Sequence, residues 1–193
     1  FIGSHTCLSL INDGYDVLII DSLVNSSKLN LNNIKNIVKK NKNSNLGNII
    51  FHEGDLRDSE FLNEIFQNQI YLNNPINSVI HFAGLKSVEE SVKDPIKYWD
   101  ININSTLSLL STMKRFNCNN FVFSSSATIY KPLANEKLYE DSPQKPINPY
   151  GNTKISIEIL LEDLFLSEIN KWRIINLRYF NPVGAHESGE IGE

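Results

Sequence analysis

The sequence predicts an α/β protein built on a doubly wound parallel sheet. Short apolar runs alternate along the chain with segments that have the period of a helix. Continuous apolar runs are typical of strands buried on both faces of a parallel sheet. Polar or glycine residues follow most of these runs, at the strand ends where such sheets bind ligands. The 193 residues, 41% of them hydrophobic, suffice for one globular domain with a sizeable core.

The first half of the chain alternates helix and strand. A helix over 5–12 should end at Asp13-Gly14, a good C-terminal stop, and the apolar strand 16–20 should end at Asp21. Residues 25–45 are polar and rich in asparagine with partial helical period, and we interpret them as a tolerated surface insertion. The next expected elements are a strand at 48–51, a helix at 59–67 and a strand at 78–82.

The second half continues the alternation. Residues 95–116 are expected to form one long helix, with Pro95 near its first turn. Residues 131–148 are expected to be a proline-bearing loop, followed by a helix over 150–166. The remaining expected elements are strands at 120–124 and 172–178.

Composition excludes several classes of function. The net charge of −4 gives no basic face, so we expect no nucleic-acid partner. No apolar run approaches the ~18 residues that span a bilayer, so we expect no membrane association. Cys7 and Cys118 are isolated, which favours a reduced, cytoplasmic setting. The four histidines lack the spacing of metal ligands, and His81, inside an apolar strand, is expected to be a packed core residue rather than a ligand.

A serine-rich strand end and a tyrosine–lysine helix carry the strongest chemical signal. Ser124–Ser126 follow the apolar run 121–123, and Tyr150 lies four residues before Lys154 on one helix face. The lysine ammonium can lower the pKa of the phenol, and a phenolate is a strong general base for a hydroxyl group. This set suits removal of a proton from an alcohol whose carbon loses hydride.

The tyrosine–lysine pattern also has a purely structural interpretation. It is short and arises by chance in many helices, where the tyrosine is an interfacial aromatic and the lysine a solvated end. The order of features along the chain favours catalysis, because Asp21 ends an early strand and the serines end a later one.

The start of the chain indicates a nucleotide site. Gly3 would be the last glycine of a phosphate-binding turn at a helix N-terminus. Asp21 lies eighteen residues further on, close to the ~20 expected for the acidic residue that binds a ribose 2′-hydroxyl.

These motifs resemble those of the UDP-glucose 4-epimerases, which are extended members of the short-chain dehydrogenase/reductase superfamily. The resemblance covers nearly the whole chain and implies a Rossmann fold. Two blocks, at 82–86 and 177–186, are very specific to the family, whereas the glycine turn and the tyrosine–lysine pair are shared across the superfamily. The matching stretches are Ile2–Thr6, Asp21–Leu23, Glu53–Leu56, Val79–Lys86, Phe123–Tyr130, Pro149–Gly151 and Leu177–His186.

The resemblance implies a role for each matching residue. Tyr150 would be the catalytic base, Ser126 its partner on the sugar hydroxyl, and Lys154 the residue that holds the nicotinamide ribose. Asn181 would contact the UDP-sugar phosphates, and no metal is implied. The implied NAD-binding residues are Gly3, Asp21, Asn25, Ser26, Asp55, Leu56, Phe82, Ala83, Gly84, Lys86, Asn102, Ser126, Tyr150, Lys154 and Phe180.

The implied reaction interconverts UDP-galactose and UDP-glucose through a 4-keto sugar. Hydride leaves C4 for NAD+ and returns to the opposite face, so NAD stays bound as a prosthetic group. The implied assembly is a homodimer through the helices at 95–116 and 150–166. Whether N-acetylated UDP-sugars are accepted stays open.

Three departures from the family pattern stand out. The leading strand and first glycines of the family do not precede Phe1, and Lys131 and Glu89 stand where the family usually has glycine. We expect residues 1–193 to be an NAD-binding fragment, inactive alone, with most of the nucleotide-sugar domain beyond Glu193.

Two other functions remain as alternatives. A nucleotide-sugar 4,6-dehydratase or decarboxylase shares hydride abstraction at C4, but the dehydratases carry an acidic pair where this chain has Ala127 and Thr128. A non-catalytic dinucleotide-binding module is the third possibility, although such proteins usually lack the tyrosine or the lysine.

Overall fold

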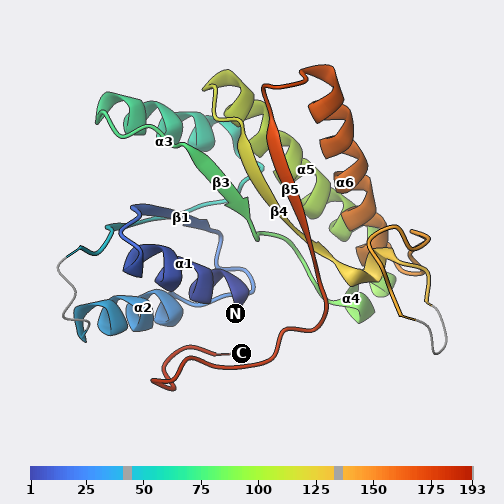
Figure 1. The fold of residues 1–193 in the computed structure, drawn as a ribbon, viewed down its shortest axis with the longest axis horizontal. Coiled ribbons are helices and arrows are strands. Elements are labelled where there is room, and N and C mark those ends of the chain that lie inside the picture. Colours follow the sequence, from blue (N-terminus) through green and yellow to red (C-terminus); the bar gives the residue numbers. More distant parts are fainter. Residues whose placement is uncertain (41–44, 133–136, 193) are drawn as a thin grey trace. The chain divides into compact units, whose positions relative to one another are not determined.

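The computed structural model describes residues 1–40, 45–132 and 137–192. The chain forms two compact units (Figure 1). The first comprises Phe1–Asp55 with Asn181–Glu193, and the second Leu56–Phe180. Strands within each unit are parallel, as predicted, and each unit holds its own sheet of described strands.

The first unit pairs two strands and covers them with two helices. Its elements are α1 (Ile2–Asn12), β1 (Val17–Asp21), α2 (Lys28–Lys40) and β2 (Ile49–Glu53), with Val17 opposite Ile49 and Asp21 opposite Glu53. The stop after α1 is as expected, because Gly14 has φ +86°, a conformation that glycine adopts without strain.

The interpretation of 25–45 as a surface insertion is wrong for most of the segment. Residues 28–40 form α2, and Ile34 is buried in the core beside Leu8 and Ile11 of α1. The apolar residues of 25–45 repeat at helical spacing, and burying that stripe outweighs the polarity of the many asparagines. Residues 41–44 of the same segment lie outside the described residues.

The second unit carries the larger sheet, in the order β3–β4–β5. Its helices α5 and α6 pack against each other, and α6 also contacts β4 and β5 (Figure 1). Phe121 and Phe123 of β4 are fully buried, as are Tyr98 and Met113 of α5 and Ile157 of α6. The elements are α3 (Ser59–Tyr71), β3 (Ser78–His81), α4 (Val88–Lys93), α5 (Pro95–Arg115), β4 (Asn120–Ser126), η1 (Ala127–Ile129), α6 (Pro149–Ser167) and β5 (Arg173–Tyr179).

Local sequence explains where the helices of this unit begin. Asp58 caps α3 by accepting from the backbone N–H groups of Glu60 and Phe61. Asp94 and Asn148 cap α5 and α6 in the same way, each followed by a proline, whose fixed φ suits the first turn. The sequence did not predict α4, whose six residues are too few to display a helical period.

Candidate active site

The site begins at the carboxyl end of β4, beyond the apolar residues 121–123. The strand was expected to end at residue 124, but it continues to Ser126 because Ser125 and Ser126 still pair with Arg178 and Tyr179 of β5. Ser126 then caps η1, and its Oγ accepts from the backbone N–H of Thr128 at 3.2 Å and from its hydroxyl at 3.0 Å. Two donors thus fix the Ser126 oxygen and leave its own proton free to be shared.

The first turn of α6 packs directly on η1. The Asn148 side chain accepts from the Gly151 N–H at 2.8 Å and so starts the helix. A Cβ at Gly151 would lie 2.7 Å from the Thr128 carbonyl oxygen and 2.8 Å from Cβ of Pro146. Only glycine allows this approach, which places the preceding residue, Tyr150, beside Ser126.

Tyr150 is buried, and the Ser126 hydroxyl is close enough to interact with its phenol. Its ring packs with Leu85 and Tyr98 in one apolar cluster. Burial raises the pKa of the Tyr150 phenol, and the Ser126 hydrogen bond lowers it by less. The expectation that Lys154 depresses this pKa is therefore not met in this structure, because loss of hydration of the phenolate outweighs the other effects.

Lys154 is not a solvated helix end. Its side chain is buried, and Nζ donates to the Ser124 carbonyl at 2.7 Å. The ammonium lies 4.7 Å from the ring centroid of Phe123 and 5.7 Å from that of Tyr150. Burial lowers the pKa of Lys154 to about 8, although the negative charge of Glu158 opposes this. An amine with this pKa stays largely protonated at neutral pH.

Asn102 of α5 holds the loop that follows β3. Its Oδ1 accepts from the Leu85 N–H at 2.8 Å, and its Nδ2 donates to the Leu85 carbonyl at 3.2 Å and to Thr153 Oγ1 of α6 at 3.1 Å. Gly84 has φ +144°, and a Cβ there would lie 3.0 Å from Asn102 Oδ1. Asn102 thereby fastens this loop to both long helices.

His81, at the end of β3, is a core residue as expected. It is 2% exposed, and its Nε2 lies 3.0 Å from Thr106 Oγ1. Burial, together with the nearby Lys154 charge, lowers the pKa of His81 to about 3. The imidazole is therefore neutral at physiological pH. Among the described residues, no cluster of His, Cys, Asp or Glu could hold a metal ion.

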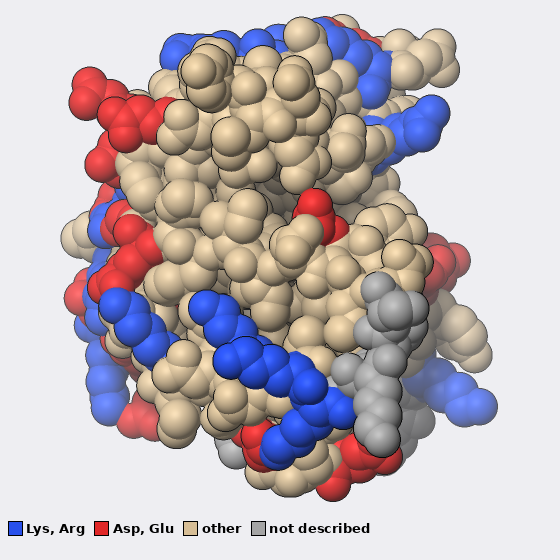
Figure 2. Space-filling model, turned by 90° about the vertical axis from the view of Figure 1, so that its left-hand side faces the viewer, with Lys and Arg blue, Asp and Glu red and all other residues tan. Residues whose placement is uncertain are grey.

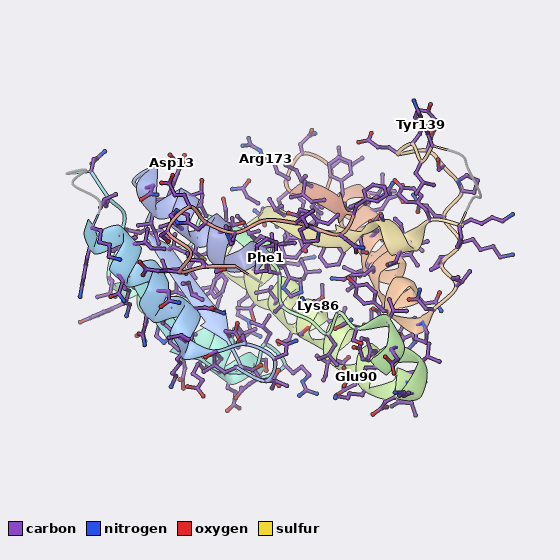
Figure 3. The ribbon with its side chains drawn as sticks, turned by 90° about the horizontal axis from the view of Figure 1, so that it is seen from below. Phe1, Asp13, Lys86, Glu90, Tyr139 and Arg173 are labelled. Atoms are coloured by element: carbon purple, nitrogen blue, oxygen red, sulfur yellow. The ribbon has the colours of Figure 1, made fainter. Side chains whose placement is uncertain are left out.

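The other predicted site residues divide between the two units. In the second, Leu56 is buried, Phe82 and Gly84 are half-buried, and Ala83, Lys86 and Phe180 are exposed. Figure 3 shows Lys86 near Glu90 of α4, where the loop after β3 enters that helix. The first unit contains Gly3, Asp21, Asn25, Ser26, Asp55 and Asn181, and their convergence with Tyr150 stays a prediction.

Asp21 organises the segment after β1. Its carboxylate accepts from the Leu23 N–H at 2.8 Å and from the Ser26 hydroxyl at 2.7 Å. Leu23 has φ +57°, so the chain turns sharply around the carboxylate. Asp21 and Ser26 thus form one polar group at the carboxyl end of a strand, whereas Asn25 is exposed beside them.

Sequence reasoning missed Glu158 and Arg178. Glu158 of α6 is buried and accepts from Ser125 and from Arg178 of β5, with 2.7 Å between Arg178 Nη2 and Glu158 Oε2. The spacing offered a signal for Glu158, because it lies four residues after Lys154 and therefore on the same helix face. No local pattern pointed to Arg178, whose partner is distant in sequence.

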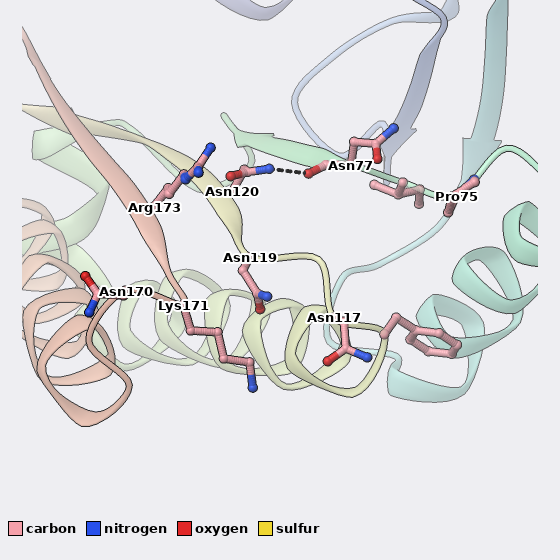
Figure 4. Close-up of a pocket in the computed structure, with 10 residues that line it drawn as sticks. Pro75, Asn77, Asn117, Asn119, Asn120, Asn170, Lys171 and Arg173 are labelled. Atoms are coloured by element: carbon pink, nitrogen blue, oxygen red, sulfur yellow. Dashed lines mark hydrogen bonds between the residues drawn. The ribbon is translucent and has the colours of Figure 1, made fainter.

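A second polar region lies at the opposite end of the sheet. A pocket of about 390 Å³ is lined by asparagines, Lys171 and Arg173 near the amino ends of β3, β4 and β5 (Figure 4). Asn120 Nδ2 donates to the Asn77 carbonyl at 2.8 Å, and Lys171 pairs with Glu168 at 2.6 Å. Lys171 and Arg173 are exposed and Asn120 is half-buried, and none of them matches a motif that the sequence singled out.

One face of the molecule carries charged side chains of both signs. Figure 2 shows Lys and Arg side chains in separate groups, with Asp and Glu elsewhere on the same face and uncharged surface between them. Within the part of the chain that the structure describes, no helix is both long and apolar enough to cross a membrane.

Comparison with known proteins identifies the family. The family model described as GDP-mannose 4,6 dehydratase matches residues 1–193. The chain is 44% identical over 193 residues to a UDP-glucose 4-epimerase of Bacillus subtilis, covering all of this chain and 53% of that protein. It is 45% identical to UDP-glucose 4-epimerase 2 of Arabidopsis thaliana, covering 52% of that protein.

Solved structures agree with these relatives. A UDP-glucose 4-epimerase from Bifidobacterium longum, in complex with NAD+ and UDP, superposes with a TM-score of 0.88 at 42% identity, with 100% of this chain and 54% of that chain covered. One from Stenotrophomonas maltophila, with bound NAD and formylated UDP-arabinopyranose, gives a TM-score of 0.89 at 39% identity, with 100% of this chain and 54% of that chain covered. This chain thus spans about half the length of the relatives it matches. Its strands, its helices and the match along its whole length show that it belongs to the GDP-mannose 4,6-dehydratase family, with UDP-glucose 4-epimerases among its relatives.

Proposed function

We propose that the protein containing this chain is a UDP-glucose 4-epimerase that interconverts UDP-galactose and UDP-glucose. The observation that carries the proposal is that Ser126, Tyr150 and Lys154 are all buried together, with the ammonium 5.7 Å from the phenol ring. Similarity to epimerases along the whole chain gives this group a substrate class.

The chain's own groups divide the proton chemistry between them. Tyr150 takes the proton of the sugar 4-hydroxyl, and Ser126 holds that hydroxyl within hydrogen-bond reach of the phenol. Lys154 places a positive charge 5.7 Å from the phenol ring, which favours the phenolate, although burial outweighs this effect and keeps the pKa of Tyr150 above its usual value. When the 4-keto sugar is reduced on its other face, Tyr150 returns the proton, so the pair ends each cycle in its initial state.

The residues present fit NAD, which would accept hydride from C4 and return it. Gly84 has φ +144° and no side chain, so Asn102 can approach the backbone closely and hold the loop after β3 in place. The carboxylate of Asp21 can bind ribose hydroxyls and would repel a 2′-phosphate, which favours NAD over NADP. The further residues that would hold NAD are Gly3, Asn25, Ser26, Asp55, Leu56, Phe82, Ala83, Lys86, Lys154 and Phe180, and Asn181 would contact the phosphates of the UDP-sugar.

Two observations favour epimerisation over the alternatives. Elimination by a 4,6-dehydratase needs acid–base groups after the serine, but Ala127 has none and Thr128 donates its hydroxyl proton to Ser126. A non-catalytic module could use Lys154 to hold NAD, but it would have no use for a phenol and a serine hydroxyl buried beside that ammonium.

The proposed assembly is a homodimer through α5 and α6. Large apolar side chains are exposed on both helices, among them Trp99 and Leu107 on α5 and Ile159 and Phe165 on α6. Apolar side chains gathered on adjacent helices are typical of protein interfaces. A cytoplasmic location fits the free thiols of Cys7 and Cys118.

The test uses the full-length protein. We expect conversion of UDP-galactose to UDP-glucose without added cofactor, and release of NAD rather than NADP when the protein is denatured. A product that has lost water, or no conversion although NAD is bound, would contradict the proposal and favour the dehydratase or the binding module, respectively.

A further inference from the structure

A buried ion pair lies directly behind the serine–tyrosine–lysine group. The Glu158 side chain of α6 is 6% exposed and that of Arg178 of β5 is 22% exposed. Arg178 Nε lies 3.2 and 3.1 Å from the two carboxylate oxygens of Glu158, and Nη2 lies 2.7 Å from one of them. This fork-like geometry holds both side chains in one orientation.

The pair also contacts the strand end and the loop before α6. Ser125, the neighbour of Ser126, donates its hydroxyl proton to Glu158. Arg178 Nη1 donates to the Tyr130 hydroxyl and to the Glu140 carbonyl, both at 2.8 Å. One ion pair therefore joins β4, β5, α6 and both sides of the segment that separates Ser126 from Tyr150.

Without the negative charge of Glu158, the two positive charges of Lys154 and Arg178 would have no anion between them to offset them. Among the described residues, the titratable groups of the elements packed around Lys154 include His81 of β3, Tyr98 of α5, Tyr150 and Glu158 of α6, and Arg178 of β5 through Glu158. His81 is neutral above pH 3, since its pKa is lowered to about 3. Glu158 pairs with Arg178, and its negative charge also opposes the effect of burial on the pKa of Lys154, four residues earlier on the same face of α6.

We propose that Glu158 and Arg178 are positioning residues: the Glu158 carboxylate stabilises the buried Lys154 ammonium against the Ser124 carbonyl, and Arg178 holds that carboxylate in place. Arg178 holds the Glu158 carboxylate so that it does not displace the ammonium from the Ser124 carbonyl. The proposal deepens the proposed function and rests on the role assigned there to Lys154.

The two members of the pair should act on Lys154 with opposite sign. Glu158→Gln removes a negative charge while keeping an oxygen for Ser125 and Arg178, so the pKa of Lys154 should fall. Arg178→Gln removes a positive charge and leaves Glu158 unneutralised, so the pKa of Lys154 should rise. Each change should be about one pH unit, the scale for charges a few ångströms apart in a protein interior. The double variant should return close to the parent.

The experiment is an NMR titration of Lys154 in full-length holoprotein labelled with 13C at lysine Cε, with its signal assigned from Lys154→Arg. Glu162→Gln, an exposed carboxylate on the same helix, and Arg173→Gln, at the far end of β5, serve as matched controls and should leave the midpoint unmoved. Arg178→Lys should restore the midpoint because it restores the charge. If Arg178→Gln does not fold, Glu158→Gln and Arg178→Lys still decide the question.

The directions of the Lys154 pKa shifts in the two single variants distinguish a positioning role from a merely structural one. Loosened packing would admit water and raise the midpoint in both single variants, and that outcome, or an unmoved midpoint in Glu158→Gln, would overturn the proposal. Epimerase activity is not needed for the titration. Opposite shifts in a protein that does not convert UDP-galactose would refute the proposed function alone, whereas conversion with an unmoved midpoint would refute the positioning role alone.

Discussion

The two ends of the three-stranded sheet are both polar, but they differ in how their polar groups are held. At the carboxyl end, Ser126, Tyr150 and Lys154 are at most 9% exposed and each has a defined partner. At the amino end, Arg173 and several asparagines line an open pocket, and Lys171 pairs with a neighbour three residues away. Polar composition is therefore a poor guide to chemistry, whereas burial with fixed partners is a good one, because shifting a pKa requires loss of water.

The largest expected effect is at Tyr150, which carries the proposed proton transfer. Tyr150→Phe in the full-length protein should lower turnover at least ~10²-fold, the usual scale for loss of a general base, and leave NAD binding largely intact. Steady-state assay of UDP-galactose conversion, with NAD content measured on the same sample, checks this. Near-normal turnover would remove Tyr150 from the mechanism.

A smaller effect is expected at Gly151, which lets the first turn of α6 pack on η1 and so places Tyr150 beside Ser126. Gly151→Ala places a methyl group 2.7 Å from a backbone oxygen, so α6 must shift away from η1. We expect a loss of about 1–3 kcal/mol in the free energy of unfolding, typical of overpacking, and about a tenfold loss of turnover from misplacement of Tyr150.

Denaturant unfolding and turnover assays measure the two losses at Gly151. Asn152→Ala, one residue further along α6, is the control and should change both by much less. Wild-type turnover in Gly151→Ala would show that the close packing of α6 on η1 is not needed for the site.

A third effect is on stability and depends on pH. The buried His81 has a pKa of about 3 against 6.5 when exposed, so the unfolded state binds more protons between these values. The stability that His81 contributes is fully present above pH 6.5 and is lost as the pH falls toward 3.

Comparison of wild type with His81→Gln isolates the contribution of this histidine. Below pH 6.5 the wild type should lose roughly 1 kcal/mol per pH unit more than the variant, as linkage requires for one proton. Denaturant unfolding of the full-length protein at pH 7, 6 and 5 gives the slope of the free energy of unfolding against pH for the wild type and for the variant. Equal slopes would mean that folding does not lower the pKa of His81.

The sequence predicted the order of elements well, and it predicted the site in part. Apolar runs located the five strands that the structure describes within a few residues, because most residues of each strand are apolar. The motif resemblance pointed to Ser126, Tyr150 and Lys154, which the structure brings together. The direction of the pKa shift at Tyr150 could not be predicted, since it depends on tertiary burial by Leu85 and Tyr98. The Arg178–Glu158 pair could not be predicted from the sequence either, because its members are 20 residues apart and on different elements.

The most direct test of the central claim compares the two ends of the sheet in one experiment. Lys154→Gln and Lys171→Gln each remove one positive charge from the same unit, one at each end. Turnover of UDP-galactose by the full-length protein should fall at least ~10²-fold in the first, because the phenolate loses its charge partner, and by less than about twofold in the second. Equal losses in the two variants, or a larger loss in Lys171→Gln, would contradict the assignment of the chemistry to the carboxyl end.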